Sequence, residues 1–374
     1  MSSLAPLADL GGGDNRNLQS VLRIMRGAGV ANASDLHLKV GGVPRARVEG
    51  NLCSLDHPPL DVQTVDTAVM TLASLAGVPA ERLALKQFDF SVDVKEIGRF
   101  RVHVYTQRGT RSLALRRIPS PIPDFAALRL PRIAKRIAVT DRGLILVTGA
   151  TGNGKSTTIA SILDFLNQNA SKHVVTLEDP VEFVFDDRMC SFSQREVGRD
   201  VDTIEEGLTG VLREDPDVLF IGEIRSLAEF DVALNAAESG RVVLSSFHAA
   251  SVGQAVQRMI NLYPMEHREP ARARIADSLA AVISQKLVPK KNARENVLVT
   301  EVLTRAPTVL DCIREPSRMR GLTAALESGT REYGSHSFDQ VVRSMVQSDL
   351  ITMDTAKAVA HSANDLLRNM KLMR

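Results

Sequence analysis

Gly149-Ala-Thr-Gly-Asn-Gly-Lys-Ser156 follows the apolar run Leu144-Ile-Leu-Val-Thr148 and has the spacing G-x-x-x-x-G-K-[ST] of a phosphate-binding loop. Apolar residues recur at helical spacing directly after it: Ile159, Ile162, Leu163 and Leu166. Glycines let successive backbone N–H groups close around a phosphate, and the next helix offers it a partly positive N-terminus. The order of strand, glycine-rich turn and helix is the context that a functional loop requires, although a glycine-rich turn of this kind can also be simply a tight connection.

The pattern predicts a nucleoside triphosphatase. Lys155 would reach the β- and γ-phosphates, and the hydroxyl of Ser156 would bind Mg²⁺. The other residues predicted to surround the phosphates are Gly149, Ala150, Thr151, Gly152, Asn153, Gly154 and Thr157.

Composition limits the alternatives. A chain of 374 residues exceeds the size at which one hydrophobic core stops growing, so two domains are expected. The net charge is +2, without a basic block or interleaved aromatic residues, so nucleic acid is not an expected partner. No apolar run is long enough to span a membrane, and the first residues lack the pattern of a signal peptide. We expect a cytoplasmic protein.

The three cysteines, Cys53, Cys190 and Cys312, are widely spaced and form no C-x-x-C pair. This spacing argues against both a disulfide framework and a cysteine zinc site. We expect three buried free thiols.

Residues 1–118 predict a small α+β domain, because two helical stretches accompany several alternating segments. The helices are expected at 18–27 and 62–75, and the strands at 34–40, 46–50, 88–94, 99–105 and 113–116. Pro119-Ser-Pro-Ile-Pro123 can continue neither a helix nor a central strand, so 119–124 is predicted to be a stiff linker.

Residues 125–374 alternate strands with helices, which predicts an α/β domain with a parallel, doubly wound sheet and ligands at the carboxyl ends of its strands. The strands are expected at 144–147, 174–177, 218–221, 242–245 and 297–303. From about residue 305 a helical tail follows, and its last ten residues form an amphipathic, basic segment that would be either a solvated terminal helix or a docking helix.

Carboxylates end two of these strands. Glu223 closes Leu219-Phe-Ile-Gly-Glu223 and is our candidate for polarising the attacking water, although it could instead lie structurally beside a helix N-cap. An aspartate commonly ends this strand in the fold class, but here Gly222 precedes the glutamate, so an indirect hold on Mg²⁺ through water is expected. Glu178, Asp179 and Glu182 end another strand, and the first two are expected to hold Mg²⁺ through water.

His248 follows the strand at 242–245 and would contact the γ-phosphate if it meets Lys155, Glu178 and Glu223 at one edge of the sheet. In the first domain six arginines form a hairpin that could either lean over the nucleotide or make a solvated face. They are Arg99, Arg101, Arg108, Arg111, Arg116 and Arg117.

Taken together, these motifs resemble the secretion-superfamily traffic ATPases, and within them the type IV pilus retraction motors of the PilT and PilU kind. The matching stretches span nearly the whole chain: Ala33-Ser-Asp-Leu-His-Leu38, Gly98-Arg-Phe-Arg-Val102, the phosphate loop, Leu177-Glu-Asp-Pro-Val-Glu-Phe183, Gln194-Arg-Glu-Val-Gly198, Leu212-Arg-Glu-Asp-Pro-Asp-Val218, Ile221-Gly-Glu223 and the segment from His248 through Arg258 to Pro264.

The resemblance implies a PAS-like N-terminal domain, a RecA-like ATPase domain, a homohexameric ring, and ATP with Mg²⁺ bound between the two domains. It assigns the catalytic glutamate to Glu223, an aspartate box to Glu178, Asp179 and Glu182, and a histidine box to His248 and Arg258. It also implies that Arg101 and Arg116, with Arg108 behind them, help to neutralise the γ-phosphate. The Mg²⁺ contacts would come from Ser156 and Asp179.

The branch of the family is less constrained. The absence of C-x-x-C pairs argues against the extension ATPases, and Val309-Leu-Asp-Cys-Ile-Arg-Glu315 partly matches a retraction signature. Ala150, His248-Ala249 and His361-Ser-Ala-Asn-Asp-Leu366 are nearer to PilU-like proteins, which work beside a primary retraction motor. A DotB-like ATPase of a type IVB secretion or conjugation system shares the fold and most motifs.

Two further functions stay open: a poorly hydrolysing accessory ring for a partner motor, and a nucleic-acid motor, which the scarcity of aromatic residues disfavours. The expected location is cytoplasmic, at the inner face of the bacterial inner membrane. The expected partners are a platform protein of that membrane and a paralogous retraction ATPase.

Overall fold

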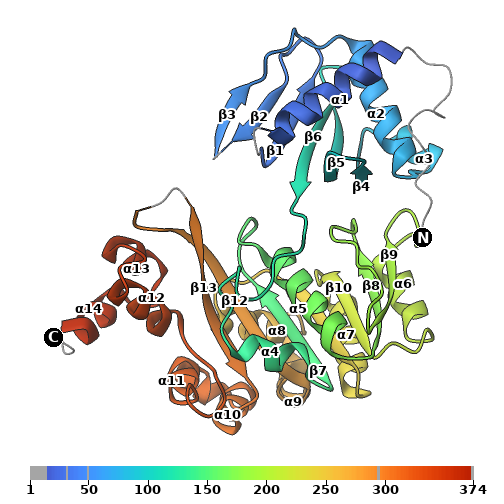
Figure 1. Ribbon diagram of the computed structural model, residues 1–374. Helices are drawn as coiled ribbons and strands as arrows, with labels where there is room; N and C mark the ends of the chain where they lie inside the picture. Colours follow the sequence, from blue (N-terminus) through green and yellow to red (C-terminus); the bar gives the residue numbers. More distant parts are fainter. Residues whose placement is uncertain (1–14, 31–32, 49, 293–294, 372–374) are drawn as a thin grey trace. The chain divides into compact units, whose positions relative to one another are not determined.

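The computed structural model describes residues 15–30, 33–48, 50–292 and 295–371 (Figure 1). It divides into unit 1, which comprises Met1–Ser120 and Asp179–Glu182, and unit 2, which comprises Pro121–Glu178 and Phe183–Arg374. The polar, glycine-rich start of the chain lies outside the described residues, as do the last three residues of the basic C-terminal segment.

Unit 1 contains, within the described residues, a six-stranded antiparallel sheet in the order β3-β2-β1-β6-β5-β4. Strand β5 shows why the segment folds this way, because Phe100, Val102 and Val104 alternate with polar residues and are buried while their neighbours remain on the other face. The strands are β1 (Asp35–Lys39), β2 (Arg45–Val48), β3 (Asn51–Ser54), β4 (Gln87–Val94), β5 (Gly98–Gln107) and β6 (Thr110–Ile118).

Helices pack their apolar residues on this sheet, and Met25, Val69 and Leu72 join its core. They are α1 (Asn15–Val30), α2 (Val62–Leu75) and the short α3 (Ala80–Leu83). Helix α2 begins where the Asp61 side chain accepts a hydrogen bond from the Thr64 N–H, which satisfies one of the free donors of the first turn.

Strand β3 was not expected from the sequence, and it corrects the prediction for Cys53. All four residues of β3 are exposed because the strand forms the edge of the sheet. Cys53 is therefore an exposed thiol, whereas Cys190 and Cys312 are buried as expected. Burial raises the pKa of both the Cys190 and the Cys312 thiol.

Unit 2 contains, in the part of the chain that is described, a seven-stranded sheet in the order β13-β12-β7-β11-β10-β8-β9 (Figure 1). Its strands are β7 (Gly143–Thr148), β8 (His173–Glu178), β9 (Ser191–Glu196), β10 (Val218–Glu223), β11 (Val242–Phe247), β12 (Leu279–Pro289) and β13 (Asn296–Thr304). All six residues of the central strand β7 are buried, as both-face burial of a parallel strand requires.

The predicted parallel α/β sheet is confirmed, with one correction. Strand β13 pairs antiparallel with β12, so the predicted strand at 297–303 is not parallel to the others. Strands β9 and β12 were not expected. Strand β12 lies between β7 and β13 and so forms the side of the sheet next to the phosphate loop.

The helices that alternate with these strands cover the sheet (Figure 1). They are α4 (Ile133–Ala138), α5 (Lys155–Asn169), α6 (Ile204–Val211), α7 (Leu227–Glu238), α8 (Val252–Asn261), the 3-10 turn η2 (Met265–His267) and α9 (Arg268–Ser278). Helix α7 begins at a capping box of Ser226 and Glu229, which fixes its start directly after β10.

The predicted helical tail is present from α10 onward. Its elements are α10 (Pro307–Arg314), η3 (Pro316–Gly321), α11 (Leu322–Ser328), α12 (Phe338–Gln347), α13 (Met353–Val359) and α14 (Ala363–Lys371). The last three helices share an apolar cluster with β12 and β13, in which Val288, Val299, Phe338 and Leu366 are buried. Buried Leu366 and partly buried Met370 join α14 to this cluster. No helix within the described ranges is long and apolar enough to cross a membrane.

Candidate functional site

The phosphate loop connects β7 to α5. Gly154, the N-cap of α5, has φ 80°, and Gly149 has φ 151°. A Cβ added at Gly149 would lie 2.6 Å from the carbonyl oxygen of Gln285, so backbone packing excludes a side chain there. The Lys155 Nζ donates to the carbonyl oxygens of Gly149 (3.0 Å) and Ala150 (3.3 Å), which holds the ammonium group over the loop.

Strand β12 supports the loop from the side. The Gln285 amide donates to the carbonyl oxygen of Asn153 (2.5 Å), and the Leu287 N–H donates to the Asn153 side chain (3.2 Å). The Ser284 and Thr148 hydroxyls form a buried hydrogen bond of 2.6 Å. These residues of β12 were missed, because they lie more than a hundred residues after the loop in the sequence and nothing in the sequence around them indicates that they contact it.

The register of the sheet places Glu223 at the same edge as the loop. Thr148 pairs with Phe247 of β11, and Glu223 of β10 pairs with Ser246 of β11. Since parallel strands end at a common edge, the end of β10 lies one strand beyond the end of β11. The two oxygens of the Glu223 carboxylate are held by neighbours in the same unit.

Glu223 is held between two basic side chains. Its Oε1 lies 2.7 Å from Nε2 of His248, and its Oε2 accepts a hydrogen bond of 2.8 Å from Nε of Arg225. The Glu223 side chain is 20% exposed and that of His248 is 43% exposed, so the pair faces solvent at the edge of the sheet. Arg225 was missed by the sequence analysis, and its position two residues after a strand-ending carboxylate was the available signal.

Glu178 ends the neighbouring strand β8 and is buried. Its Oε1 accepts a hydrogen bond from the Thr176 hydroxyl (2.9 Å), with the Gln194 amide 3.4 Å away. Strand β10 pairs with β8, and a Cβ at Gly222 would be in ordinary van der Waals contact with the Cα of Glu178 (3.4 Å). Glu178 and Glu223 therefore lie on adjacent strand ends, as the sequence predicted.

The other two predicted carboxylates, Asp179 and Glu182, belong to unit 1. Asp179 is exposed, and Oε1 of Glu182 accepts a hydrogen bond of 3.2 Å from Nη1 of Arg101 in the same unit. Of the three predicted carboxylates, only Glu178 belongs to the unit that carries the phosphate loop.

His248 and Arg258 lie beside the loop, as expected. The Arg258 Nη1 donates to the His248 carbonyl oxygen (2.7 Å), and its guanidinium carbon lies 5.5 Å from the centre of the Phe247 ring. A cavity of about 470 Å³ is lined by Gly149, Ala150, His248, Ala249, Ala250, Gln254, Gln257, Arg258 and Asn261. Two residues of the phosphate loop and four residues of α8 therefore line one pocket.

Arg101 and Arg116 are paired across β5 and β6 in unit 1. The Arg116 Nε donates to Oδ1 of Asp35 (2.9 Å), while Arg101 contacts Glu182 and lies 3.9 Å from Asp89. Each guanidinium of this opposed pair has an acidic neighbour, which offsets their mutual repulsion. Their contact with nucleotide stays a prediction, as does that of Arg108 in the turn between the strands.

The donor set at the loop fits a magnesium ion bound in the manner of phosphate-loop enzymes. Within the described residues no group of three or more histidine, cysteine, aspartate or glutamate side chains could hold a metal by itself. Mg²⁺ prefers one or two protein oxygens together with water and substrate phosphates. The exposed hydroxyl of Ser156, in the first turn of α5, meets that need.

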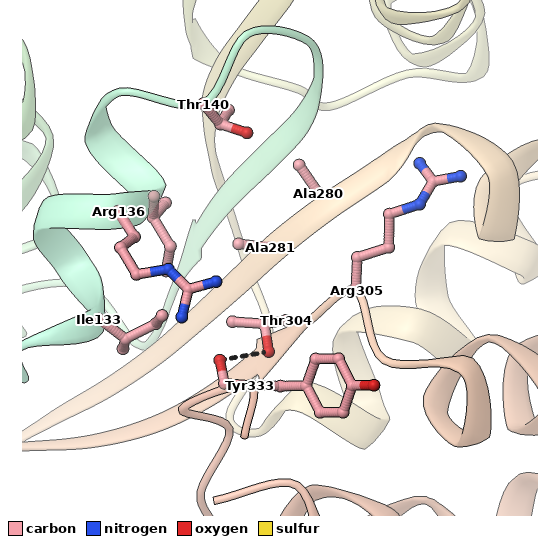
Figure 2. Close-up of a pocket in the computed structure, with 9 residues that line it drawn as sticks. Ile133, Arg136, Thr140, Ala280, Ala281, Thr304, Arg305 and Tyr333 are labelled. Atoms are coloured by element: carbon pink, nitrogen blue, oxygen red, sulfur yellow. Dashed lines mark hydrogen bonds between the residues drawn. The ribbon is translucent and has the colours of Figure 1, made fainter. Parts of the chain in front are cut away.

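A second cavity of about 170 Å³ lies elsewhere in unit 2, between α4 and the end of β13 (Figure 2). Two of the polar side chains that line it, Thr304 and Arg305, bind backbone carbonyl groups of the fold. The Thr304 hydroxyl donates to the carbonyl oxygen of Tyr333 (3.0 Å), and Nη1 of Arg305 donates to the carbonyl oxygen of Asp277 (2.5 Å). The phosphate-loop cavity is therefore the better candidate for an active site.

Comparison with known proteins agrees with this geometry. The family model described as "Type II/IV secretion system protein" matches residues 18–367. Over 331 residues the chain is 35% identical to the type IV pilus retraction ATPase PilT of Pseudomonas aeruginosa, covering 88% of this chain and 94% of the relative. It is 34% identical over 359 residues to the type IV pilus ATPase PilU of the same organism, covering 95% and 91%.

Solved structures show the same likeness. The crystal structure of the pilus retraction motor PilT with bound ADP superposes with a TM-score of 0.84 at 34% identity, covering 93% of this chain and 99% of that one. The ATPase DotB of Legionella pneumophila superposes with a TM-score of 0.76 at 26% identity, covering 91% and 95%.

Proposed function

The chain belongs to the type II/IV secretion system protein family, and from this premise we propose that it is an ATP-hydrolysing motor that drives retraction of a type IV pilus. Membership and the named relatives make it an ATPase. The observation that carries the proposal is the placement of Glu223, His248 and the phosphate loop at one edge of one sheet.

Each of these residues has a role in the proposed hydrolysis. The phosphate loop and Lys155 bind the β- and γ-phosphates. The carboxylate of Glu223 accepts a hydrogen bond from the attacking water and orients it in line with the leaving group. His248 and Arg225, which hold the two oxygens of Glu223, fix its orientation, and the Arg225 guanidinium supplies positive charge near the γ-phosphate as negative charge shifts in the transition state.

Magnesium, when bound, would neutralise charge on the β- and γ-phosphates. The hydroxyl of Ser156 is the proposed direct ligand, and the buried carboxylate of Glu178 on the neighbouring strand would accept hydrogen bonds from metal-bound water. Asp179, which belongs to unit 1, is likewise proposed to contribute its carboxylate to the binding of Mg²⁺. The arginines Arg101 and Arg116 are proposed to meet the γ-phosphate in a state that brings unit 1 to the nucleotide.

The larger assembly is proposed from the same premise. We propose a homohexameric ring at the cytoplasmic face of the inner membrane, which acts on a membrane platform protein and works beside a paralogous retraction ATPase. The likeness to PilT, PilU and a twitching motility protein of Neisseria gonorrhoeae supports this proposal. The proposed domain division is 1–118, a linker at 119–124 and an ATPase domain at 125–374.

Replacement of the chromosomal gene by a Glu223→Gln variant tests the proposal. We expect loss of twitching motility and retention of surface pili, because filaments that cannot be retracted accumulate. The matched control is Glu205→Gln, a change at an exposed carboxylate in the first turn of α6, which should leave twitching unchanged.

The likeness to DotB supports one alternative, an ATPase that energises a type IVB secretion or conjugation system. Loss of effector or plasmid transfer with intact twitching in the Glu223→Gln strain would favour that alternative over retraction. A third function, an accessory ring that binds ATP and hydrolyses it poorly, predicts phosphate release only in a mixture with the partner motor.

A further inference from the structure

A buried carboxylate, Glu301 of β13, lies outside the residues that the proposed hydrolysis uses. Its side chain is 1% exposed, so its charge requires partners within the fold. In the register of the sheet Glu301 pairs with Ser284, and Ser284 pairs with Thr148, the residue directly before the phosphate loop. Glu301 therefore occupies the row of the sheet that ends at the loop.

One oxygen of Glu301 binds the start of α8. Its Oε2 accepts a hydrogen bond of 2.7 Å from the N–H of Val252, the first residue of the helix. This N–H is one of the donors that a helix leaves without an intrahelical partner. The negative charge of Glu301 also interacts favourably with the positive end of the helix dipole. Glu301 thus fixes where α8 begins relative to the sheet.

The position of α8 decides the shape of the nucleotide pocket. The loop from His248 to Ser251 leads into α8 and is tied to it at two points: Arg258 binds the His248 carbonyl oxygen, and Gln254 accepts from the Ala250 N–H (3.2 Å). The same helix residues line the cavity beside the phosphate loop. A shift of α8 would therefore move His248, and with it one support of Glu223.

The other oxygen of Glu301 binds the C-terminal helices. Its Oε1 lies 2.5 Å from Nε2 of His361, which lies between α13 and α14. The same segment is held by a hydrogen bond from the His361 N–H to Asp339 (2.7 Å) and by one from Nζ of Lys286 to the Val359 carbonyl oxygen (3.0 Å). A single carboxylate thus joins the C-terminal helices to the start of α8.

We propose that Glu301 is a positioning residue that couples docking of the C-terminal helices, through His361, to the placement of α8 and of His248 at the nucleotide site. The proposal rests on the proposed ATPase site. Because His248 supports Glu223, loss of this coupling slows hydrolysis and weakens discrimination between nucleoside triphosphate and diphosphate, while binding of the diphosphate at the loop is kept.

The charges around His361 give the coupling a pH dependence. The hydrogen bond with Glu301 is the largest cause that raises the pKa of His361 above 6.5; burial opposes it, Asp339 adds to it and Lys286 lowers it. The charge of Glu301 also acts on His336, whose Nε2 lies 3.1 Å from the Thr300 hydroxyl. A raised histidine pKa means that the charged pair is complete at low pH and is lost as pH rises through the pKa of the folded protein.

The test measures kcat, KM, and the affinities for ADP and for a non-hydrolysable ATP analogue in four variants. Glu301→Ala should lower kcat by roughly ten- to a hundredfold, as small misplacements near reacting groups do, with unchanged affinity for ADP. Glu301→Gln keeps an acceptor for the Val252 N–H but loses the charged pair with His361, so it should recover only part of this loss. Glu295→Gln, an exposed carboxylate just before β13, is the matched control and should behave as wild type.

His361→Gln supplies the pH measurement. Wild-type kcat should fall as pH rises through the raised pKa of His361, and His361→Gln should lack this fall. Identical pH profiles would overturn the proposal, as would wild-type kcat in Glu301→Ala. If Glu301→Ala does not fold, Glu301→Gln and His361→Gln still decide. A wild-type protein without ATPase activity would refute the proposed function instead.

Discussion

Lys155 is the residue whose charge the proposed site needs most directly. Its Nζ is held by the Gly149 and Ala150 carbonyl oxygens, over the loop where phosphates would bind. Lys155→Ala should abolish ATP binding and lower phosphate release by about a hundredfold or more, as loss of one preorganised charge contact does. Lys135→Ala, at an exposed lysine of α4, is the matched control and should change neither quantity. Wild-type turnover in Lys155→Ala would refute the assignment.

A change of glycine to alanine should have opposite effects on stability at Gly149 and at Gly27. Gly149 has φ 151° and its Cβ would lie 2.6 Å from the Gln285 carbonyl oxygen, so Gly149→Ala should lower the free energy of unfolding by about 1–3 kcal/mol. Gly27 lies within α1, with no atom within 4 Å of its Cβ position, and Gly27→Ala should raise stability by about 0.5–1 kcal/mol. Chemical unfolding measures both, and equal effects of the two changes would contradict this account of the loop.

At the scale of elements, His336 gives a pH dependence opposite to that of His361. Burial is the largest cause that lowers the pKa of His336 below 6.5, and its ring lies 3.2 Å from the Gly334 carbonyl oxygen. As pH falls below the unfolded pKa, the unfolded chain takes up a proton that the folded protein does not, so stability decreases. His336→Gln should therefore show a smaller fall in melting temperature between about pH 7 and about pH 5.

Exposed His267, beside η2, supplies the control for this measurement. His267→Gln should keep the wild-type fall in melting temperature on acidification. An unchanged fall in His336→Gln would show that the buried imidazole does not contribute.

The elements that could be predicted are those with a local pattern. Strands β7, β8, β10 and β11 are continuous apolar runs, because both faces of a parallel strand are buried. Strand β9 was missed since its sequence, Ser-Phe-Ser-Gln-Arg-Glu, is that of a polar edge strand. Strand β12 was missed because it follows α9 without a break, and only pairing with β7 and β13 makes it extended.

At the scale of the whole molecule, the sequence predicted the site residues that follow strands and missed those that act across the sheet. Glu178, Glu223 and His248 were predictable, because parallel strands end at one edge. Gln285 and Glu301 were not, since they reach Asn153 and Val252 from sequence positions far away. The roles of Arg101 and Arg116 stay predictions, because they depend on how unit 1 meets bound nucleotide.

The central claim is that Glu223 activates water for ATP hydrolysis at the edge of the unit 2 sheet. Phosphate release and ATP binding by purified Glu223→Gln, measured beside wild type and Glu205→Gln, test it most directly. The change keeps the size of the side chain and removes its charge, so phosphate release should fall by about a hundredfold or more while ATP still binds. Phosphate release at the wild-type rate in Glu223→Gln would contradict the claim.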